Sequence, residues 1–196
     1  MPGHMTPMAH AAVIARVCAA LSNDQADDAR ALIATEYPHI PVVAVGRRYS
    51  KREFVAVFAR DGYIDRYSGQ RLVFPGTLRL LSLLLPAELP YHPNWKTEAC
   101  HRMWWDLYPT IDHVVPVARG GEDAEPNWVT TSMLRNAAKA NWTLDELGWE
   151  LLPPGDLAEW DGLTGWCLQY LTDHPELAGL DAGLRQWAAA ARRPGP

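Results

Sequence analysis

Apolar residues recur at helical spacing in several parts of the chain. After Ser50, the residues Phe54, Val57 and Phe58 fall on one face of a helix. This helix should end near residues 61 and 62, because an Asp-Gly dipeptide is typical of turns. The pattern therefore predicts an amphipathic helix with one buried face.

Two capping boxes mark further helix starts. Ser22 stands three residues before Gln25 and predicts a helix that reaches about residue 37, and Thr143 stands three residues before Glu146 and predicts a short helix closed by Gly148. Weaker patterns predict the remaining helices, over residues 11–21, 97–107, 132–140, 157–172 and 180–191.

Strand-forming residues gather in the second half of the chain. Thr110–Val117 is rich in β-branched residues, a Gly-Gly loop follows, and Asn127–Thr130 is a second short β-rich run. Residues 42–45 form another β-branched run, and residues 71–74 follow a turn and fit the start of a strand. Residues 78–85 are too uniformly apolar for periodicity to distinguish a helix from a buried strand.

These elements predict an α+β fold: a strand, a loop, a strand and a helix, embedded in a mostly helical single domain. We expect an N-terminal helical extension over residues 1–46, a core over residues 47–150 and a C-terminal helical extension over residues 151–196. A chain of 196 residues is long enough for one substantial core.

Composition narrows the class of protein. The richest apolar run, residues 78–89, is interrupted by charged residues and proline, and the first residues lack the pattern of a secretory signal. The three cysteines, Cys18, Cys100 and Cys167, are far apart and form no C-x-x-C pair. We therefore expect a cytoplasmic protein with no membrane partner, no disulfide framework and no four-cysteine zinc site.

Charge is distributed unevenly along the chain. The net charge is −5, although between Arg47 and Ala140 Lys and Arg outnumber Asp and Glu by 13 to 10. The acidic excess therefore lies on the two flanks. A mildly basic middle segment is compatible with a polyanionic partner, although such charges also serve solvation.

One segment carries a specific constellation of polar residues. Asp112 precedes His113, Asn127 follows 14 positions later, Asn136 a further 9 positions later, and Lys139 three residues after that. This spacing, with the Gly-Gly loop, resembles the HNH endonuclease family in the His-Asn-Asn form of its ββα-metal motif. A looser resemblance covers the Arg-Asp-Gly at residues 60–62 and the Tyr-Ser-Gly at residues 67–69.

The resemblance implies a role for each residue of the motif. His113 would be the general base that activates a water molecule for in-line attack on phosphorus. Asp112 and Asn136 would bind one divalent cation through oxygen, an arrangement that suits Mg²⁺ or Mn²⁺ better than zinc. The cation would stabilise the transition state, and the products would carry 5′-phosphate and 3′-hydroxyl ends.

The remaining residues would support this centre. Asn127 would pin the loop near His113, and Lys139, one helical turn after Asn136, would contact a phosphate. Arg119 and Arg135 are further candidates for phosphate contact. Strict strand alternation would direct Asp112 and His113 to opposite faces, so their joint use requires a strand end or a local twist.

The chain departs from the family pattern in two ways. Many members hold the motif with a structural zinc bound by two C-x-x-C pairs, whereas here Ser68 occupies a cysteine position and residues 131–135 contain no cysteine. We therefore expect no structural zinc, and apolar packing in its place, supplied by Trp128, Met133, Leu134, Trp142 and Trp149. The second departure is Asn136 in place of a final histidine, which favours a cation that prefers oxygen ligands.

The sequence thus predicts a metal-dependent HNH-type endonuclease that hydrolyses DNA, with RNA and a homodimer or partner protein also compatible. One alternative is a non-catalytic nucleic-acid-binding module on the same fold. Another is a mainly helical interaction protein in which the motif is accidental, a role that the acidic flanks would suit.

Overall fold

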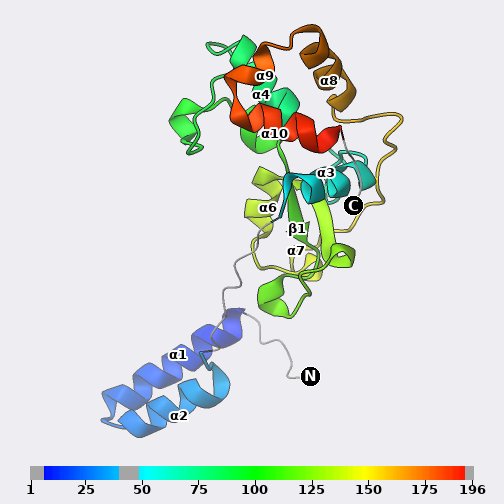
Figure 1. Cartoon of the computed structure of the whole chain (residues 1–196). Coiled ribbons are helices and arrows are strands. Elements are labelled where there is room, and N and C mark those ends of the chain that lie inside the picture. The colour runs from blue at the N-terminus through cyan, green and yellow to red at the C-terminus, as the bar shows by residue number, and fades with distance from the viewer. Residues whose placement is uncertain (1–6, 40–48, 193–196) are drawn as a thin grey trace. The chain divides into compact units, whose positions relative to one another are not determined.

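The computed structural model describes residues 7–39 and 49–192, which form two compact units within residues 1–46 and 47–196. The β-branched run at residues 42–45 lies outside the described residues. The first unit contains α1 (Pro7–Ser22) and α2 (Ala26–Glu36), which pack against each other (Figure 1). The second unit contains all other described elements.

The turn between α1 and α2 corrects the capping box predicted at Ser22. α1 continues through Ser22, and Asp24 then adopts a positive φ of 59°. Gln25 is therefore the N-cap residue of α2, and its side chain makes no capping hydrogen bond. The prediction was wrong because the preceding helix uses the residue that was expected to start the next one.

The second unit is built around a two-stranded antiparallel sheet of β1 (Pro109–His113) and β2 (Trp128–Ser132). Their register pairs His113 with Trp128 and Ile111 with Thr130. α3 (Lys51–Arg60) and α6 (Met133–Lys139) both pack against the two strands (Figure 1). The chain is thus a mixed α and β protein with a small sheet, and the order strand, loop, strand, helix is present.

Further helices extend the core beyond α3. α10 contacts α3, α4 and α8, and the shared apolar interior includes Phe58, Leu80, Cys167 and Leu184, each without exposed surface. Residues 151–192, in the predicted C-terminal extension, therefore belong to the same compact unit as the sheet. The remaining helices of this unit are α4 (Pro75–Leu84), α5 (Met103–Asp106), α7 (Leu144–Leu147), α8 (Thr164–Asp173), α9 (Leu177–Leu180) and α10 (Ala182–Ala191).

Several local predictions are confirmed. The amphipathic helix predicted after Ser50 is α3, and the predicted capping box of Thr143 with Glu146 starts α7, which ends at Gly148 in the left-handed region. The structure adds a capping box between Ser50 and Glu53 at the start of α3. The undecided run at residues 78–85 is mainly helical, as part of α4.

The helix predicted over residues 97–107 is wrong. A short 3₁₀ helix (Thr97–Ala99) and α5 are separated by Cys100, whose backbone is extended with φ −124° and ψ 142°. His101 is held outside a helix by two hydrogen bonds. Its N–H donates to the carbonyl of Pro90 (2.8 Å), and its Nδ1 accepts from the N–H of Met103 (3.2 Å). These contacts interrupt the helix between the two short segments.

The segment at residues 71–74 also differs from its prediction. Arg71 forms an isolated antiparallel bridge with Ile64, the N–H groups of residues 72–74 donate to carbonyls of three different segments, and α4 begins directly at Pro75. Proline at the first helical position favours this start, because its missing N–H would have no partner inside the helix.

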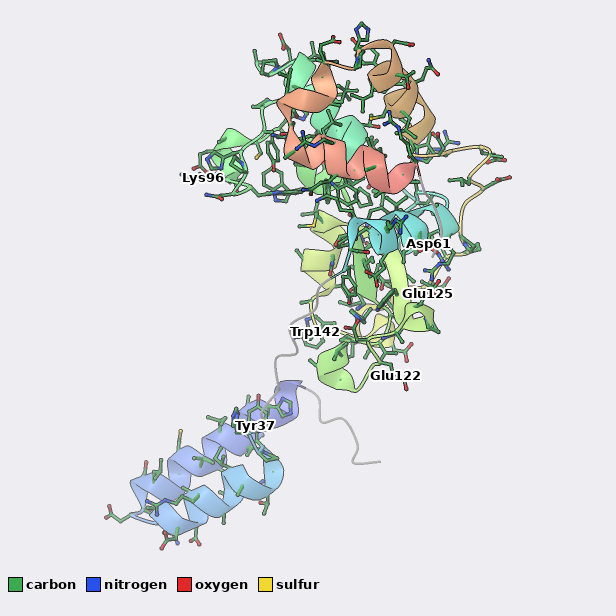
Figure 2. All side chains as sticks on the ribbon, in the orientation of Figure 1. Tyr37, Asp61, Lys96, Glu122, Glu125 and Trp142 are labelled. Carbon is green, nitrogen blue, oxygen red and sulfur yellow. The ribbon has the colours of Figure 1, made fainter. Side chains whose placement is uncertain are left out.

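The outer edge of β2 is held by the turn after α3. Asp61, which is fully buried and labelled in Figure 2, accepts a hydrogen bond at Oδ2 from the N–H of Thr130 (2.7 Å). Its Oδ1 accepts from Arg66 Nη1 (2.8 Å) and Arg60 Nε (3.0 Å). Arg60 in turn donates from Nη2 to the carbonyl of Trp128 (2.6 Å). One buried carboxylate thus links α3 to the strand.

A second buried carboxylate continues this contact. Asp65 accepts at Oδ2 from the N–H of Ser132 (3.1 Å), and the N–H of Arg66 donates to the carbonyl of Thr130 (2.9 Å). The outward N–H and C=O groups of β2 are therefore paired with residues 60–66. An isolated pair of strands is marginally stable, so this edge fixes the strand that faces β1.

Candidate active site at the end of β1

Asp112 lies on the face of β1 that is covered by α6. Its side chain is mostly buried, and Oδ2 accepts hydrogen bonds from Tyr67 Oη (2.7 Å) and Lys139 Nζ (2.9 Å). Burial and the charge of Asp112 raise the pKa of Tyr67, so this phenol remains a hydrogen-bond donor. Both donors thus fix the orientation of the Asp112 carboxylate.

Lys139 also joins Asp112 to the neighbouring residue. It has no exposed surface, and its Nζ donates to the main-chain carbonyl of His113 (2.7 Å). A lysine this deeply buried requires a charged or strongly polar partner, which Asp112 provides. Phosphate contact was expected for Lys139, but in this arrangement its ammonium group is used inside the protein.

His113 faces the opposite side of the sheet, and its Nε2 lies 2.8 Å from Asp123 Oδ1. The same oxygen accepts from Tyr49 Oη (2.5 Å) and Trp128 Nε1 (3.0 Å). The hydrogen bond from Tyr49, with those from His113 and Trp128, holds the pKa of Asp123 below its usual range. An ionised carboxylate accepts only, so Nε2 of His113 carries the proton and Nδ1 is the nitrogen with the free lone pair.

Strand alternation is therefore maintained at this point. Asp112 contacts Tyr67 and Lys139, whereas His113 contacts Asp123 and Tyr49. The local twist that joint use would require is not seen inside the strand. His113 is, however, the last residue of β1, so the pair does lie at a strand end.

Asn127 holds the loop that follows β1. Its Oδ1 accepts from the N–H of Val115 (2.9 Å), and its Nδ2 donates to the carbonyls of Val115 (2.9 Å) and Glu122 (2.8 Å). Gly120 has a positive φ of 89°, and a Cβ atom on Gly121 would collide with the carbonyl oxygen of Val115. The Gly-Gly pair is thus required by the tight return of this loop, and Asn127 closes it.

Asn136 projects from α6 toward β1. Its Nδ2 donates to the carbonyl of Ile111 (3.3 Å), the residue before Asp112, which leaves Oδ1 available as a ligand. Among the described residues, no group of three or more His, Cys, Asp or Glu side chains is arranged to hold a metal ion. The two motif residues expected to bind the cation thus offer one carboxylate, from Asp112, and one amide oxygen, from Asn136.

The two arginines expected to contact phosphate have protein partners. Arg119 Nη2 lies 3.4 Å from Glu146 Oε1, and the Arg135 guanidinium lies 4.8 Å from the ring centre of Trp149. Phosphate contact by Arg119 and Arg135 stays a prediction.

The apolar clamp expected around the motif is only partly present. Trp142, labelled in Figure 2, is 44% exposed and Leu134 is 47% exposed, so neither forms part of a core. Trp149 contacts the ring of Tyr67, and Trp128 packs against the main core. The prediction was wrong for Trp142 and Leu134, and the contacts that hold β2 include hydrogen bonds to the buried carboxylates of residues 61 and 65.

Sequence reasoning missed three side chains of the site: Tyr49, Tyr67 and Asp123. Asp123 belongs to the Gly-Gly-Glu-Asp loop, and its position ten residues after His113 was the available signal. Tyr67 belongs to the Tyr-Ser-Gly segment, and the resemblance of that segment to the family was the available signal. Tyr49 lies 64 residues before His113, and no local pattern indicates its role.

Comparisons with protein-family models, with curated proteins and with solved structures each gave no match. Within the described ranges, no helix combines the length and apolar character needed to cross a membrane.

Proposed function

We propose that this protein is an HNH-type endonuclease that hydrolyses DNA phosphodiester bonds with the help of one divalent cation. The observation that carries the proposal is the contact of Lys139 Nζ with both the Asp112 carboxylate and the His113 carbonyl. This contact links three residues of the spaced motif at the end of β1. The free thiols of Cys18, Cys100 and Cys167 suit a reducing cytoplasm.

His113 would act as the general base through Nδ1. Asp123 accepts from Nε2 and so selects the tautomer in which Nδ1 is unprotonated. The base would take a proton from a water molecule as that water attacks phosphorus. Asn127 supports this step indirectly, because it fixes the loop that carries Asp123.

The donor set fits a hard cation. Both donors to Asp112 use Oδ2, which leaves Oδ1 for a ligand bond, and Asn136 offers its amide oxygen. Mg²⁺ is commonly bound by one or two protein oxygens, with water and substrate phosphate completing its shell, and Mn²⁺ accepts similar ligands. When bound, such a cation would stabilise negative charge on the phosphate and on the departing 3′ oxygen.

A second candidate function is a non-catalytic nucleic-acid-binding module. The contacts of the proposed catalytic residues favour this module, because Asp112 is paired with Lys139 and the Nε2 of His113 is paired with Asp123. The two functions differ in one property: the module would bind nucleic acid and leave it intact.

The proposal is tested by incubating the purified protein with supercoiled plasmid. We expect nicked circles with Mg²⁺ or Mn²⁺ and none with EDTA, because hydrolysis requires the cation. Asn136→Ala should lower the nicking rate, and Asn23→Ala in the first unit should leave it unchanged. Cutting that persists in EDTA contradicts the proposed metal dependence, and binding without cutting favours the module. A parallel incubation with RNA identifies the substrate.

Asp123→Asn is expected to slow cleavage about 10- to 100-fold, with little change in KM. An amide can donate to Nε2 and thereby shift the proton to Nδ1, the nitrogen that we assign as the base. Asp123→Glu should restore part of kcat, because it retains an ionised acceptor. An unchanged kcat in Asp123→Asn would contradict the assignment of Nδ1 as the unprotonated nitrogen of His113, whatever the effect of the substitution on stability.

A further inference from the structure

A cavity lined by aromatic side chains lies outside the candidate active site. It has a volume of about 320 Å³, and its walls include five aromatic residues: Tyr91, Trp95, Trp104, Tyr108 and Trp187. We call it the aromatic pocket. At about 30 Å³ per water molecule, this volume corresponds to roughly ten waters. The pocket therefore has room for a single flat ring system with part of its substituent.

The rings present several orientations to the pocket. Trp95 meets Tyr108 nearly perpendicularly, with ring centres 4.9 Å apart, and Trp104 at 5.5 Å. Trp95 is half-buried and has a positive φ of 50°, an uncommon conformation for a bulky residue. Such strain persists where the surroundings enforce it, and here it places an indole against its neighbours.

Two polar groups of the walls are suited to hydrogen bonding. Trp104 is 2% exposed, and its indole N–H has no acceptor among the described residues. Burial raises the pKa of Tyr108, so its hydroxyl remains protonated. A buried N–H without a partner is costly, and a ligand acceptor would remove that cost where the walls part enough to admit it.

The charge at the rim favours an anion. Arg79 and Lys51 line the pocket together with one acidic residue, Asp181. Asp181 accepts from Nε and Nη2 of Arg79, and the Arg79 guanidinium lies 3.7 Å from the ring centre of Tyr91. Lys51 Nζ lies 5.1 Å from the ring centre of Trp187. These two cations leave a net positive rim, which would repel a cationic ligand.

We propose that the aromatic pocket binds one unstacked nucleotide of a single-stranded region, with its base against the aromatic walls and its phosphate near Lys51 and Arg79. Flat rings stack on indole and phenol, and cationic side chains attract phosphate. This inference rests on the proposed function, because it assigns the bound nucleotide to the same nucleic acid. Tyr108 directly precedes β1, so it lies about 16 Å along the chain from His113 at about 3.3 Å per residue. The bound nucleotide would thus lie several positions from the cleaved bond.

The test measures binding without cleavage, using a fluorescein-labelled single-stranded oligonucleotide in EDTA and fluorescence anisotropy. All proteins carry His113→Ala. Trp95→Leu keeps an apolar side chain but removes the aromatic face, so we expect about tenfold weaker binding. Trp95→Phe should retain the affinity within about threefold. The matched control is Trp166→Leu on α8, where an exposed tryptophan lies outside the pocket lining, and its affinity should equal that of the parent.

A second measurement uses the parent protein without a pocket substitution. An oligonucleotide with one 2-aminopurine should lose fluorescence on binding as that base stacks on the aromatic walls. Equal affinity of Trp95→Leu and the parent, or unchanged 2-aminopurine fluorescence at every position tested, overturns the proposal. If Trp95→Leu does not fold, the 2-aminopurine measurement decides. If binding depends on Trp95 but the wild type does not cleave, the endonuclease proposal is refuted and the pocket proposal stands. If the wild type cleaves but binding does not depend on Trp95, the pocket proposal is refuted and the endonuclease proposal stands.

Discussion

His113→Ala is expected to slow plasmid nicking by about 10²- to 10⁴-fold, the usual contribution of a general base. The substitution removes the only side chain of the site that we assign to proton transfer. It leaves the Asp112–Lys139 ion pair unchanged, and the bond from Lys139 to the carbonyl of residue 113 uses the main chain. Oligonucleotide affinity should therefore change little while the rate of cleavage falls. Single-turnover kinetics with excess enzyme separates these two quantities.

A matched control is His174→Ala, at a half-exposed histidine at the end of α8 that contacts Tyr170 and Glu176. It should cleave at the wild-type rate. Added imidazole should restore part of the activity of His113→Gly, because a diffusible base can replace the missing one, and it should not restore a variant whose fold is damaged. A His113→Ala protein that nicks at the wild-type rate would exclude His113 as the base.

Asp61→Ala is expected to lower the free energy of unfolding by about 3–5 kcal/mol, the usual result of removing one member of a buried ion pair. The Asp61 side chain is 0% exposed and Arg66 is 12% exposed, so the guanidinium would lose its partner with little access to water. The N–H of Thr130, also buried, would lose its acceptor. At about 2–4 °C per kcal/mol, the melting temperature of this unit should fall by roughly 6–20 °C.

Thermal unfolding followed by circular dichroism measures this effect. Glu150→Ala changes an exposed acidic residue and should leave the transition temperature almost unchanged. Asp61→Asn should lie between Ala and wild type, because an amide oxygen can still accept from Thr130 but cannot balance the arginines. If Asp61→Ala melts with the wild type, the link between α3 and β2 contributes far less than its burial suggests.

Features of the fold encoded within a few residues were predicted from the sequence. The helix start after Ser50 and the capping box at Thr143 depend on residues within a few positions, and both are present, whereas the capping box predicted at Ser22 is not. The two strands and the following helix were predicted near their observed positions, because turn and β-branched residues bound them. The failed helix at residues 97–107 depends on the distant carbonyl of Pro90, which no local pattern includes.

In the candidate site, too, local patterns were predicted from the sequence and contacts between distant residues were not. Asp112, His113, Asn127, Asn136 and Lys139 were selected by their spacing along the chain. The partners of these residues were not, because Tyr67 lies 45 positions from Asp112 and Tyr49 lies 64 positions from His113. The burial of Lys139 was not predicted either. A lysine on a short helix is usually exposed to solvent, yet α6 directs Lys139 into the interior, where it has no exposed surface. Which groups surround a side chain is decided by tertiary packing.

The fully occupied outer edge of β2 has a consequence for assembly. Exposed strand edges invite pairing with strands of other molecules, which leads to domain swapping or fibrous aggregates. Because residues 60–66 already satisfy the outward groups of β2, this strand offers no template for intermolecular pairing. A second copy of the chain would therefore have to associate by some means other than extending β2.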